Sequence, residues 1–228
     1  MTAVVGLVGH GRSIVTSGLI FHVDASLSQS YIGSGTTWRD LSSSASNATL
    51  INGATFNSAY GGSLVFSGSA NYATSASNTG ITGTAARTLC AWVYPTSSSS
   101  NTTVIRIGSG ANSQLYELQY DATYITGHFW GSGWAISSVH DKSILNTWTH
   151  LVMTYDGTTV SHYVDGVFKG SGNFALGTTN SVVTLSLAAY GPHFDFAGRM
   201  ASASLYNRGL TSDEVLQNYS AGRKLLNA

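Results

Sequence analysis

Charge is scarce in this sequence. Asp, Glu, Lys and Arg make up 9% of the 228 residues, against about 25% in typical soluble domains. Ten basic residues balance ten acidic ones, so the formal net charge is zero. A protein that neutralises several phosphates needs clustered cations, and the Lys and Arg residues here are scattered. The composition therefore argues against nucleic acid as a partner.

Long apolar runs and cysteine pairs are missing as well. No stretch approaches the roughly 20 apolar residues that span a bilayer, so no membrane partner is expected. The segment 1–8 has no positive region and too short an apolar stretch for a signal peptide. The single cysteine, Cys90, excludes an intrachain disulfide. Because secreted sandwiches often carry disulfides, we expect synthesis in a host cytoplasm and later use outside it.

Small polar residues and aromatics take the place of charge. Hydrophobic residues make up 43% and aromatics 11%, which is enough for a sizeable core, and 26 glycines are present. Net charge keeps like molecules apart in solution, so an uncharged exterior gives the chain little reason to remain a monomer. We expect a homo-oligomer, with a trimer as one option.

Short β-patterned segments follow one another between glycine and serine clusters. Asp156-Gly157 and Asp165-Gly166 each follow such a segment, and Asp-Gly at this position is a strong hairpin signal. The sequence predicts strands at 18–24, 63–66, 88–94, 103–108, 114–120, 148–155 and 159–164.

One helix is predicted near the end of the chain. Thr211-Ser-Asp-Glu214 forms a capping box, apolar residues then recur at helical spacing, and Gly222 is the expected stop. Many strands with one short C-terminal helix predict an all-β fold, a two-sheet antiparallel jelly-roll sandwich, over residues 18–228. Residues 1–17, which contain three glycines, are interpreted as an N-terminal arm for assembly or capsid contact; a disordered tail is the alternative.

An ordered series of segments carries a family resemblance. It opens with Ser13-Ile-Val-Thr-Ser-Gly-Leu-Ile-Phe-His-Val-Asp-Ala25 and closes with Leu205-Tyr-Asn-Arg-Gly-Leu-Thr-Ser-Asp-Glu214. Between them lie 30–31, 33–42, 48–53, 56–57 and 61–66. The series resembles the laminin G-like branch of the concanavalin A-like lectin/glucanase superfamily, in the version common in structural proteins of tailed bacteriophages. It covers nearly all of residues 13–220.

The resemblance implies a concanavalin A-like jelly roll used on phage capsids, fibres or tail appendages. We therefore expect a non-enzymatic virion structural protein at the virion surface, either a capsid decoration protein or the head of a short fibre. Its partners would be capsid or other virion proteins. The alternative is a lectin-like adhesion module that binds surface glycans, because a fold does not settle a ligand.

Departures from the family pattern bear on cofactors. Relatives often read Phe-Asp-Gly-x-x-Asp-Tyr, where this chain has Phe66-Ser-Gly-Ser-Ala-Asn-Tyr72, and Ile-Asp-Glu, where it has Met200-Ala-Ser202. Those carboxylates commonly support calcium, which favours charged oxygen ligands. No cofactor and no metal site are therefore expected, beyond a weak calcium site built from Asp24 and backbone carbonyls.

Glycosidase activity is the remote alternative. Hydrolysis needs two carboxylates about 5 to 9 Å apart, which glucanases of this fold usually supply as Glu-x-Asp-x-x-Glu. The only glutamates are Glu117 and Glu214. Asp121 shares the strand face of Glu117 but stands near a turn, and Glu214 belongs to the helix cap. The seven histidines stand singly, without metal or triad spacing, so we expect no catalytic residues and no enzyme.

The candidate ligand-binding segment runs from Tyr124 to Trp134. Its aromatic side chains are embedded in glycines, which let a flat aromatic surface approach a partner. We predict that Tyr124, His128, Trp130 and Trp134 contact a glycan or an assembly interface. The alternative is that the two tryptophans pack in or over the sandwich, as large aromatics mostly do.

Overall fold

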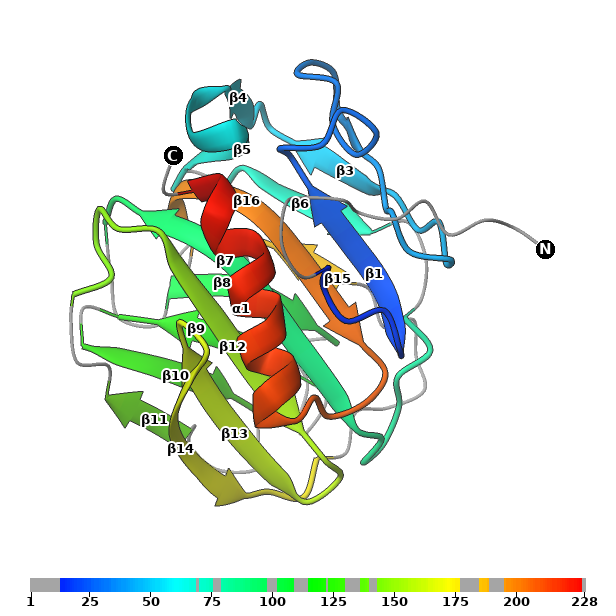
Figure 1. Ribbon diagram of the computed structural model, residues 1–228, viewed down its shortest axis with the longest axis vertical. Helices are drawn as coiled ribbons and strands as arrows, with labels where there is room; N and C mark the ends of the chain where they lie inside the picture. Colours follow the sequence, from blue (N-terminus) through cyan, green and yellow to red (C-terminus); the bar gives the residue numbers. More distant parts are fainter. Residues whose placement is uncertain are drawn as a thin grey trace.

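Two antiparallel β-sheets face each other in the computed structural model, and one helix covers the outer face of the first sheet (Figure 1). The structure describes residues 13–68, 70–75, 79–97, 102–108, 115–121, 123–129, 136–139, 143–176, 185–188 and 195–226. Every predicted strand is found, with bounds that agree within two residues. The all-β sandwich with a C-terminal helix is confirmed.

The first sheet, sheet A, is built around β16 (Ala197–Tyr206). In order of pairing its strands are β14 (Val167–Asn173), β13 (Thr159–Val164), β12 (Thr149–Tyr155), β7 (Arg87–Pro95), β16, β5 (Ser63–Ser67) and β4 (Thr55–Asn57). β1 (Leu19–Asp24) also pairs with β16. The first half of β16 pairs with β5 and the second half with β1. The C-terminal strand β16 therefore lies beside the N-terminal strand β1.

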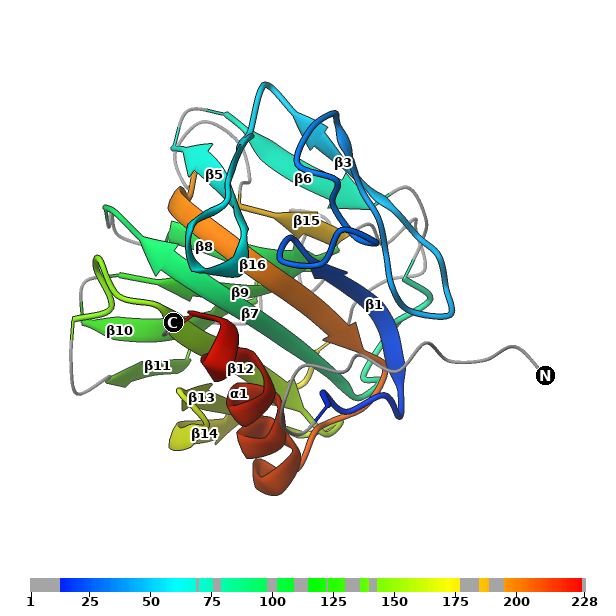
Figure 2. The ribbon, with the colours of Figure 1, turned by 45° about the horizontal axis from the view of Figure 1, so that its top comes forward.

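The second sheet, sheet B, contains eight strands. In order of pairing they are β11 (Ile136–Val139), β10 (Tyr124–His128), β9 (Tyr116–Tyr120), β8 (Thr102–Ile107), β15 (Leu185–Leu187), β6 (Tyr72–Ser75), β3 (Ala48–Ile51) and β2 (Thr37–Trp38). A 3₁₀ turn, η1 (Ala59–Gly61), joins β4 to β5. Figure 2 shows sheet B behind sheet A, with the helix on the opposite side.

The core lies between the two sheets. Strand side chains alternate between faces, and the inward set from both sheets forms one continuous apolar cluster. Members that are fully buried include Val23, Leu64, Leu89, Leu118 and Leu151. The two Asp-Gly pairs connect β12 to β13 and β13 to β14, as predicted, with φ of 108° at Gly157 and 79° at Gly166.

Helix α1 (Ser212–Leu226) packs on the outer face of sheet A. The predicted capping box is present: the Glu214 amide donates to Thr211 Oγ1 at 3.3 Å, and the Thr211 amide donates to Glu214 Oε2 at 2.9 Å. The prediction that Gly222 ends the helix is wrong, because α1 continues to Leu226. Gly222 instead lies against the Trp92 indole, where an added Cβ would come within 2.1 Å of Nε1.

Residues 13–17 lie against the helix and β16 of the same chain. Val15 is buried with Tyr206 and Val215, its amide donates to Asn218 Oδ1 at 2.8 Å, and its carbonyl accepts from the Tyr206 hydroxyl at 3.0 Å. Residues 1–12 lie outside the described residues, so the arm stays a prediction. Within the described part of the chain, no helix has the length and apolar character needed to cross a membrane.

Candidate binding face of sheet B

Strand β9 carries polar side chains on the face that points away from the core. Tyr116, Leu118 and Tyr120 belong to the core cluster, so Glu117 and Gln119, which alternate with them, point outward. Both are nevertheless buried, with 2% and 3% of their surface exposed. Glutamate is almost never fully buried without a partner. This burial makes Glu117 the first candidate for a functional residue.

The strand register surrounds Glu117 with polar groups. Arg106 on β8 and His128 on β10 are its cross-strand partners. The Thr103 hydroxyl donates to Glu117 Oε1, and His128 Nδ1 lies 3.2 Å from Oε2. Each carboxylate oxygen therefore has a partner, which offsets part of the cost of removing a carboxylate from water.

The same register extends this arrangement across sheet B as one row of polar side chains. From β2 to β10 the directly paired residues are Thr37, Thr49, Thr74, Ser186, Arg106, Glu117 and His128. We call these seven residues the polar row. At about 4.8 Å between neighbouring strands, the row is about 29 Å long. It is exposed at the threonine end and buried around Arg106 and Glu117.

The structure brings two of the four predicted site residues to this face. Both Tyr124 and His128 lie on β10, where Ile125 points into the core. Because side chains alternate between faces, positions 124, 126 and 128 point outward. Tyr124 is 38% exposed, and the His128 side chain is 25% exposed. Trp130 and Trp134 lie outside the described residues, so their role stays a prediction.

Sequence reasoning missed most of the polar row. Glu117 was considered only as a catalytic acid, and Arg106 and the hydroxyl residues were not considered at all. A signal was present in the alternation of apolar and polar residues over 116–120, and in Arg106 standing within an aliphatic strand. Single threonines such as Thr49 and Thr74 carry no such signal.

The other carboxylates considered for hydrolysis have structural partners. Asp121 Oδ1 accepts hydrogen bonds from the amides of Thr123 and Tyr124, both at 2.7 Å, and so closes the β9–β10 turn. Glu214 forms two hydrogen bonds with Arg208, at 2.6 and 2.7 Å, and these lower the pKa of Glu214 to about 2. Both groups therefore stabilise local structure.

The residues considered for a calcium site form hydrogen bonds with neighbouring residues. Asn71 Oδ1 accepts from the Ser67 amide at 2.8 Å, and Asn71 Nδ2 donates to Ser67 Oγ at 2.9 Å. Asp24 Oδ1 accepts from the amide and hydroxyl of Ser26, at 2.9 and 2.6 Å. Among the described residues, no group of three or more His, Cys, Asp or Glu side chains could hold a metal ion.

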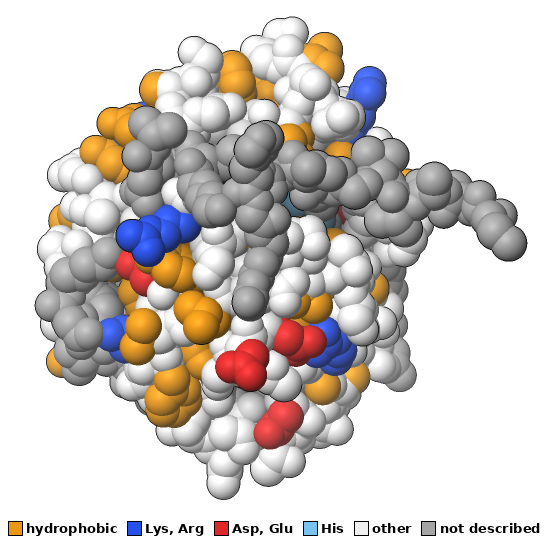
Figure 3. Space-filling view, viewed as in Figure 1, with side chains coloured by type: hydrophobic (Ala, Val, Ile, Leu, Met, Phe, Trp, Pro, Cys, Tyr) orange, Lys and Arg blue, Asp and Glu red, His pale blue; other side chains and the backbone are white. Residues whose placement is uncertain are grey.

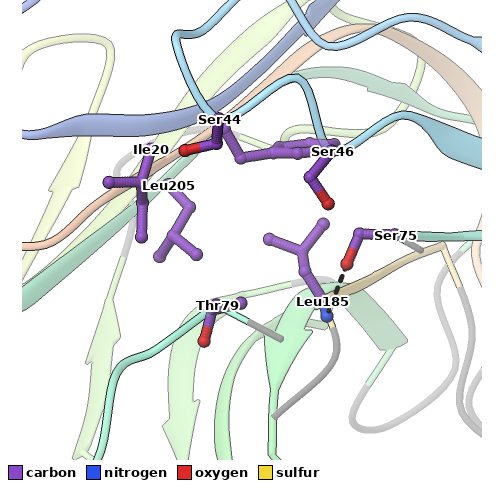
Figure 4. Close-up of a pocket in the computed structure, with 8 residues that line it drawn as sticks. Ile20, Ser44, Ser46, Ser75, Thr79, Leu185 and Leu205 are labelled. Atoms are coloured by element: carbon purple, nitrogen blue, oxygen red, sulfur yellow. Dashed lines mark hydrogen bonds between the residues drawn. The ribbon is translucent and has the colours of Figure 1, made fainter. Parts of the chain in front are cut away.

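A separate pocket opens between the sheets beside β1 (Figure 4). Its lining combines apolar side chains with hydroxyls: Ile20, Phe21, Leu185, Leu205, Ser44, Ser46, Ser75 and Thr79. The Leu185 amide donates to Ser75 Oγ at 3.2 Å. The pocket volume is about 150 Å³, below the roughly 300 to 1,000 Å³ of usual ligand pockets. We therefore place the candidate site on the polar face of sheet B.

Several solved structures share this fold. Domain 4 of AbnA, a GH43 extracellular arabinanase from Geobacillus stearothermophilus solved with arabinotriose, has a TM-score of 0.68 and 18% identity, covering 90% of this chain and 100% of that domain. Trypanosoma rangeli sialidase has a TM-score of 0.67 and 18% identity, over 93% of this chain and 34% of the sialidase.

The binding domain of Paraclostridial Mosquitocidal Protein 1 has a TM-score of 0.68 and 15% identity, over 89% of this chain and 52% of that domain. The chain thus spans about a third of the sialidase and half of the toxin domain. No curated protein matches the sequence. At these identities the likeness to solved structures shows the fold alone. A laminin G-type family profile matches residues 67–216, about two thirds of the chain, and the protein therefore belongs to the concanavalin A-like lectin/glucanases superfamily.

Proposed function

We propose that this protein is a non-catalytic glycan-binding module whose ligand lies along the polar row of sheet B. The row carries the proposal, because it lines up seven side chains that can donate or accept hydrogen bonds on one face. A hydroxyl both donates and accepts, so threonine and serine side chains match the hydroxyl groups of a sugar chain. Tyr124 adds an exposed aromatic ring on the same face.

The charge arrangement favours a neutral glycan. Glu117 is flanked by Arg106 in the strand register and by His128 at 3.2 Å, so opposite charges lie side by side. The remaining four members of the row are uncharged. The complex of the arabinanase domain with arabinotriose, a neutral oligosaccharide, supports the same ligand class by analogy.

Binding without hydrolysis is proposed because the acids weighed as partners of Glu117, Asp121 and Glu214, are engaged elsewhere in the described part of the chain. Glycosidases need a pair of carboxylates that flank the scissile bond. Asp121 is used in the β9–β10 turn, and Glu214 is used in the cap of α1. In this proposal the buried Glu117 positions His128, whose partly exposed ring contacts the sugar hydroxyls.

The test is binding of neutral oligosaccharides on a glycan array, followed by calorimetry with the best ligand. We expect Glu117→Gln to weaken binding at least tenfold, which corresponds to about 1.4 kcal/mol and is typical for loss of a hydrogen bond to a charged group. Asp213→Asn, an exposed acid on α1, is the matched control and should bind like the wild type.

Melting temperatures show whether each variant is folded. Unchanged binding by a folded Glu117→Gln variant would contradict the proposed site. Release of reducing ends that depends on Glu117 would contradict the non-catalytic assignment and support a glycosidase.

A second proposal concerns the place where the module works. We propose that it is a structural protein on the surface of a tailed-bacteriophage virion, with other virion proteins and its own copies as partners. The scarcity of charge supports this, because an exterior with little repulsion tolerates crowded packing. Figure 3 shows few charged side chains on the face with α1, and Val167, Phe168 and Leu216 are exposed apolar groups.

Cosedimentation with bare capsids tests the virion assignment, and mass photometry tests self-association. Because Val15 is part of the folded domain, the arm should be removed only up to residue 12. We expect oligomers of the full chain and loss of capsid binding in the truncated chain. A full chain that stays monomeric and does not sediment with capsids would contradict this assignment.

A further inference from the structure

Three aromatic side chains surround one arginine on the outer face of sheet A. The Arg199 guanidinium carbon lies 4.1 Å from the ring centroid of Tyr94, 5.3 Å from Tyr60 and 5.6 Å from Trp148. Tyr94 and Tyr60 each meet Trp148 edge to face, with centroid distances of 5.6 and 6.4 Å. We call these four residues the arginine cage.

The strand register and one strained turn assemble the cage. Arg199 on β16 is the cross-strand partner of Tyr94 on β7. Tyr60 belongs to η1, which also contacts α1. Its φ of 57° lies in the left-handed region, which is unfavourable for a residue with a side chain. The chain therefore holds Tyr60, 44% exposed, in a strained conformation beside the arginine.

Arg199 makes ring contacts but has no anionic partner among the residues that the structure describes. Its guanidinium takes part in no hydrogen bond or ion pair there. Asp24, whose strand pairs with the same β16, has its Oδ1 hydrogen-bonded to Ser26. The buried Trp148 Nε1 also lacks a hydrogen-bond partner within the described part. Such donors usually find partners, so we consider the cage as a candidate ligand site.

We propose that the arginine cage is a second binding site, which takes a sugar bearing a carboxylate. The planar fork of a guanidinium matches a carboxylate in a bidentate pair. Its stacking on an aromatic ring leaves the N–H edge available for that pair. The faces of Tyr60 and Tyr94 carry negative electrostatic potential, which suits the C–H groups on the face of a sugar ring.

A carboxylate fits this site better than a phosphate. Phosphate sites commonly add a helix N-terminus or several cations, whereas the cage offers one guanidinium among aromatic rings. The site lies on sheet A and the polar row on sheet B, so the two ligands would be bound by different surfaces. The inference therefore does not depend on the proposed function.

The experiment titrates the full chain with a galacturonic acid trimer and with the neutral galactose trimer of the same linkage. Calorimetry and the NMR signal of the Trp148 indole report binding. We expect the acidic trimer to bind at least tenfold more tightly than the neutral one at this site, and Arg199→Gln to abolish the difference. Arg39→Gln removes an exposed arginine that contacts no aromatic ring of the described residues, so it is the matched control and should bind like the wild type.

A second variant covers the case in which Arg199→Gln fails to fold. Tyr60→Gly removes one wall of the cage while relieving the left-handed strain, so it should keep its melting temperature and lose acidic-trimer affinity. Equal binding of the two trimers by the wild type, or unchanged preference in Arg199→Gln, would overturn the proposal. Loss of acidic-trimer binding in Glu117→Gln would also overturn it, because that result places the ligand on sheet B.

Discussion

Replacing Gly222 with alanine tests how closely α1 packs on sheet A. In an exposed helix interior this change stabilises a protein by about 1 kcal/mol. Here the new Cβ would lie 2.1 Å from Nε1, 2.8 Å from Cδ1 and 2.9 Å from Cε2 of Trp92. The indole is buried and stacks on Tyr219, with a centroid distance of 5.5 Å and an interplanar angle of 17°. The His150 ring, on the paired strand β12, has its centroid 5.2 Å from that of the indole. The indole therefore has little room to move.

The expected change in stability is the cost of the close contact with Trp92 minus the gain in helix propensity. Inserting a methyl group into a packed interface costs about 1 to 3 kcal/mol, and a contact as short as 2.1 Å belongs at the upper end. Subtracting the gain in helix propensity of about 1 kcal/mol leaves a net loss of about 2 kcal/mol. For a chain of this length, that loss lowers the melting temperature by about 4 to 8 °C.

Urea unfolding followed by far-UV circular dichroism measures the change. Ser220→Ala, on the same helix, is the control; it changes propensity without creating a close contact and should leave stability unchanged or slightly higher. In a Trp92→Leu background the clash is relieved, so Gly222→Ala should become stabilising. A Gly222→Ala variant that is more stable than the wild type in the original background would refute the close packing of α1 on Trp92.

Three further predictions follow from buried or paired groups. Burial lowers the pKa of His150 and His162 to about 4, so between pH 6.5 and 4 the unfolded chain binds protons that the folded chain does not, and stability falls as the pH falls. The free energy of unfolding, measured in urea, should therefore fall less between pH 7 and pH 4 in His162→Gln than in the wild type, by about 3 kcal/mol. An equal fall in the two proteins would contradict this. Glu214→Gln should cost about 1 kcal/mol, less in high salt, since its pair with Arg208 is partly exposed; equal losses in low and high salt would argue against an ion-pair contribution. Burial raises the pKa of the Cys90 thiol to about 12, so it should react with a disulfide reagent at pH 8 only after unfolding, and fast labelling of the native protein would show that it is accessible.

The start and the end of α1 show what local sequence can and cannot predict. The start was predicted correctly, because Thr211 and Glu214 hydrogen-bond to each other within one turn. The end was predicted wrongly. A glycine in a helical pattern usually predicts the end of the helix, but it can also occur inside a helix where a side chain would collide with a packed neighbour. Here that neighbour of Gly222 is Trp92, which lies 130 residues earlier in the chain, and no local pattern reveals it.

The same division applies to the candidate site. Tyr124 and His128 were predicted from their aromatic, glycine-rich surroundings, which are a local property. The polar row depends on pairings such as β15 with β6 and with β8, which join distant parts of the chain. A one-residue slip in any of these strands would turn its side chain to the core face. Ser186 becomes a candidate only when that register is known.

The two proposed sites differ in the physical interaction that would hold their ligands. Along the polar row, opposite charges lie beside each other and the other members are hydroxyls, so binding there depends on hydrogen bonds and should change little with ionic strength. In the arginine cage one guanidinium would carry the attraction at a partly exposed position, which salt screens with a Debye length of about 8 Å at physiological strength. Because the formal net charge is zero, the protein as a whole neither attracts nor repels an ion through net charge. Ionic strength therefore separates the two sites within one protein, because salt should release an acidic ligand from sheet A and leave a neutral ligand on sheet B.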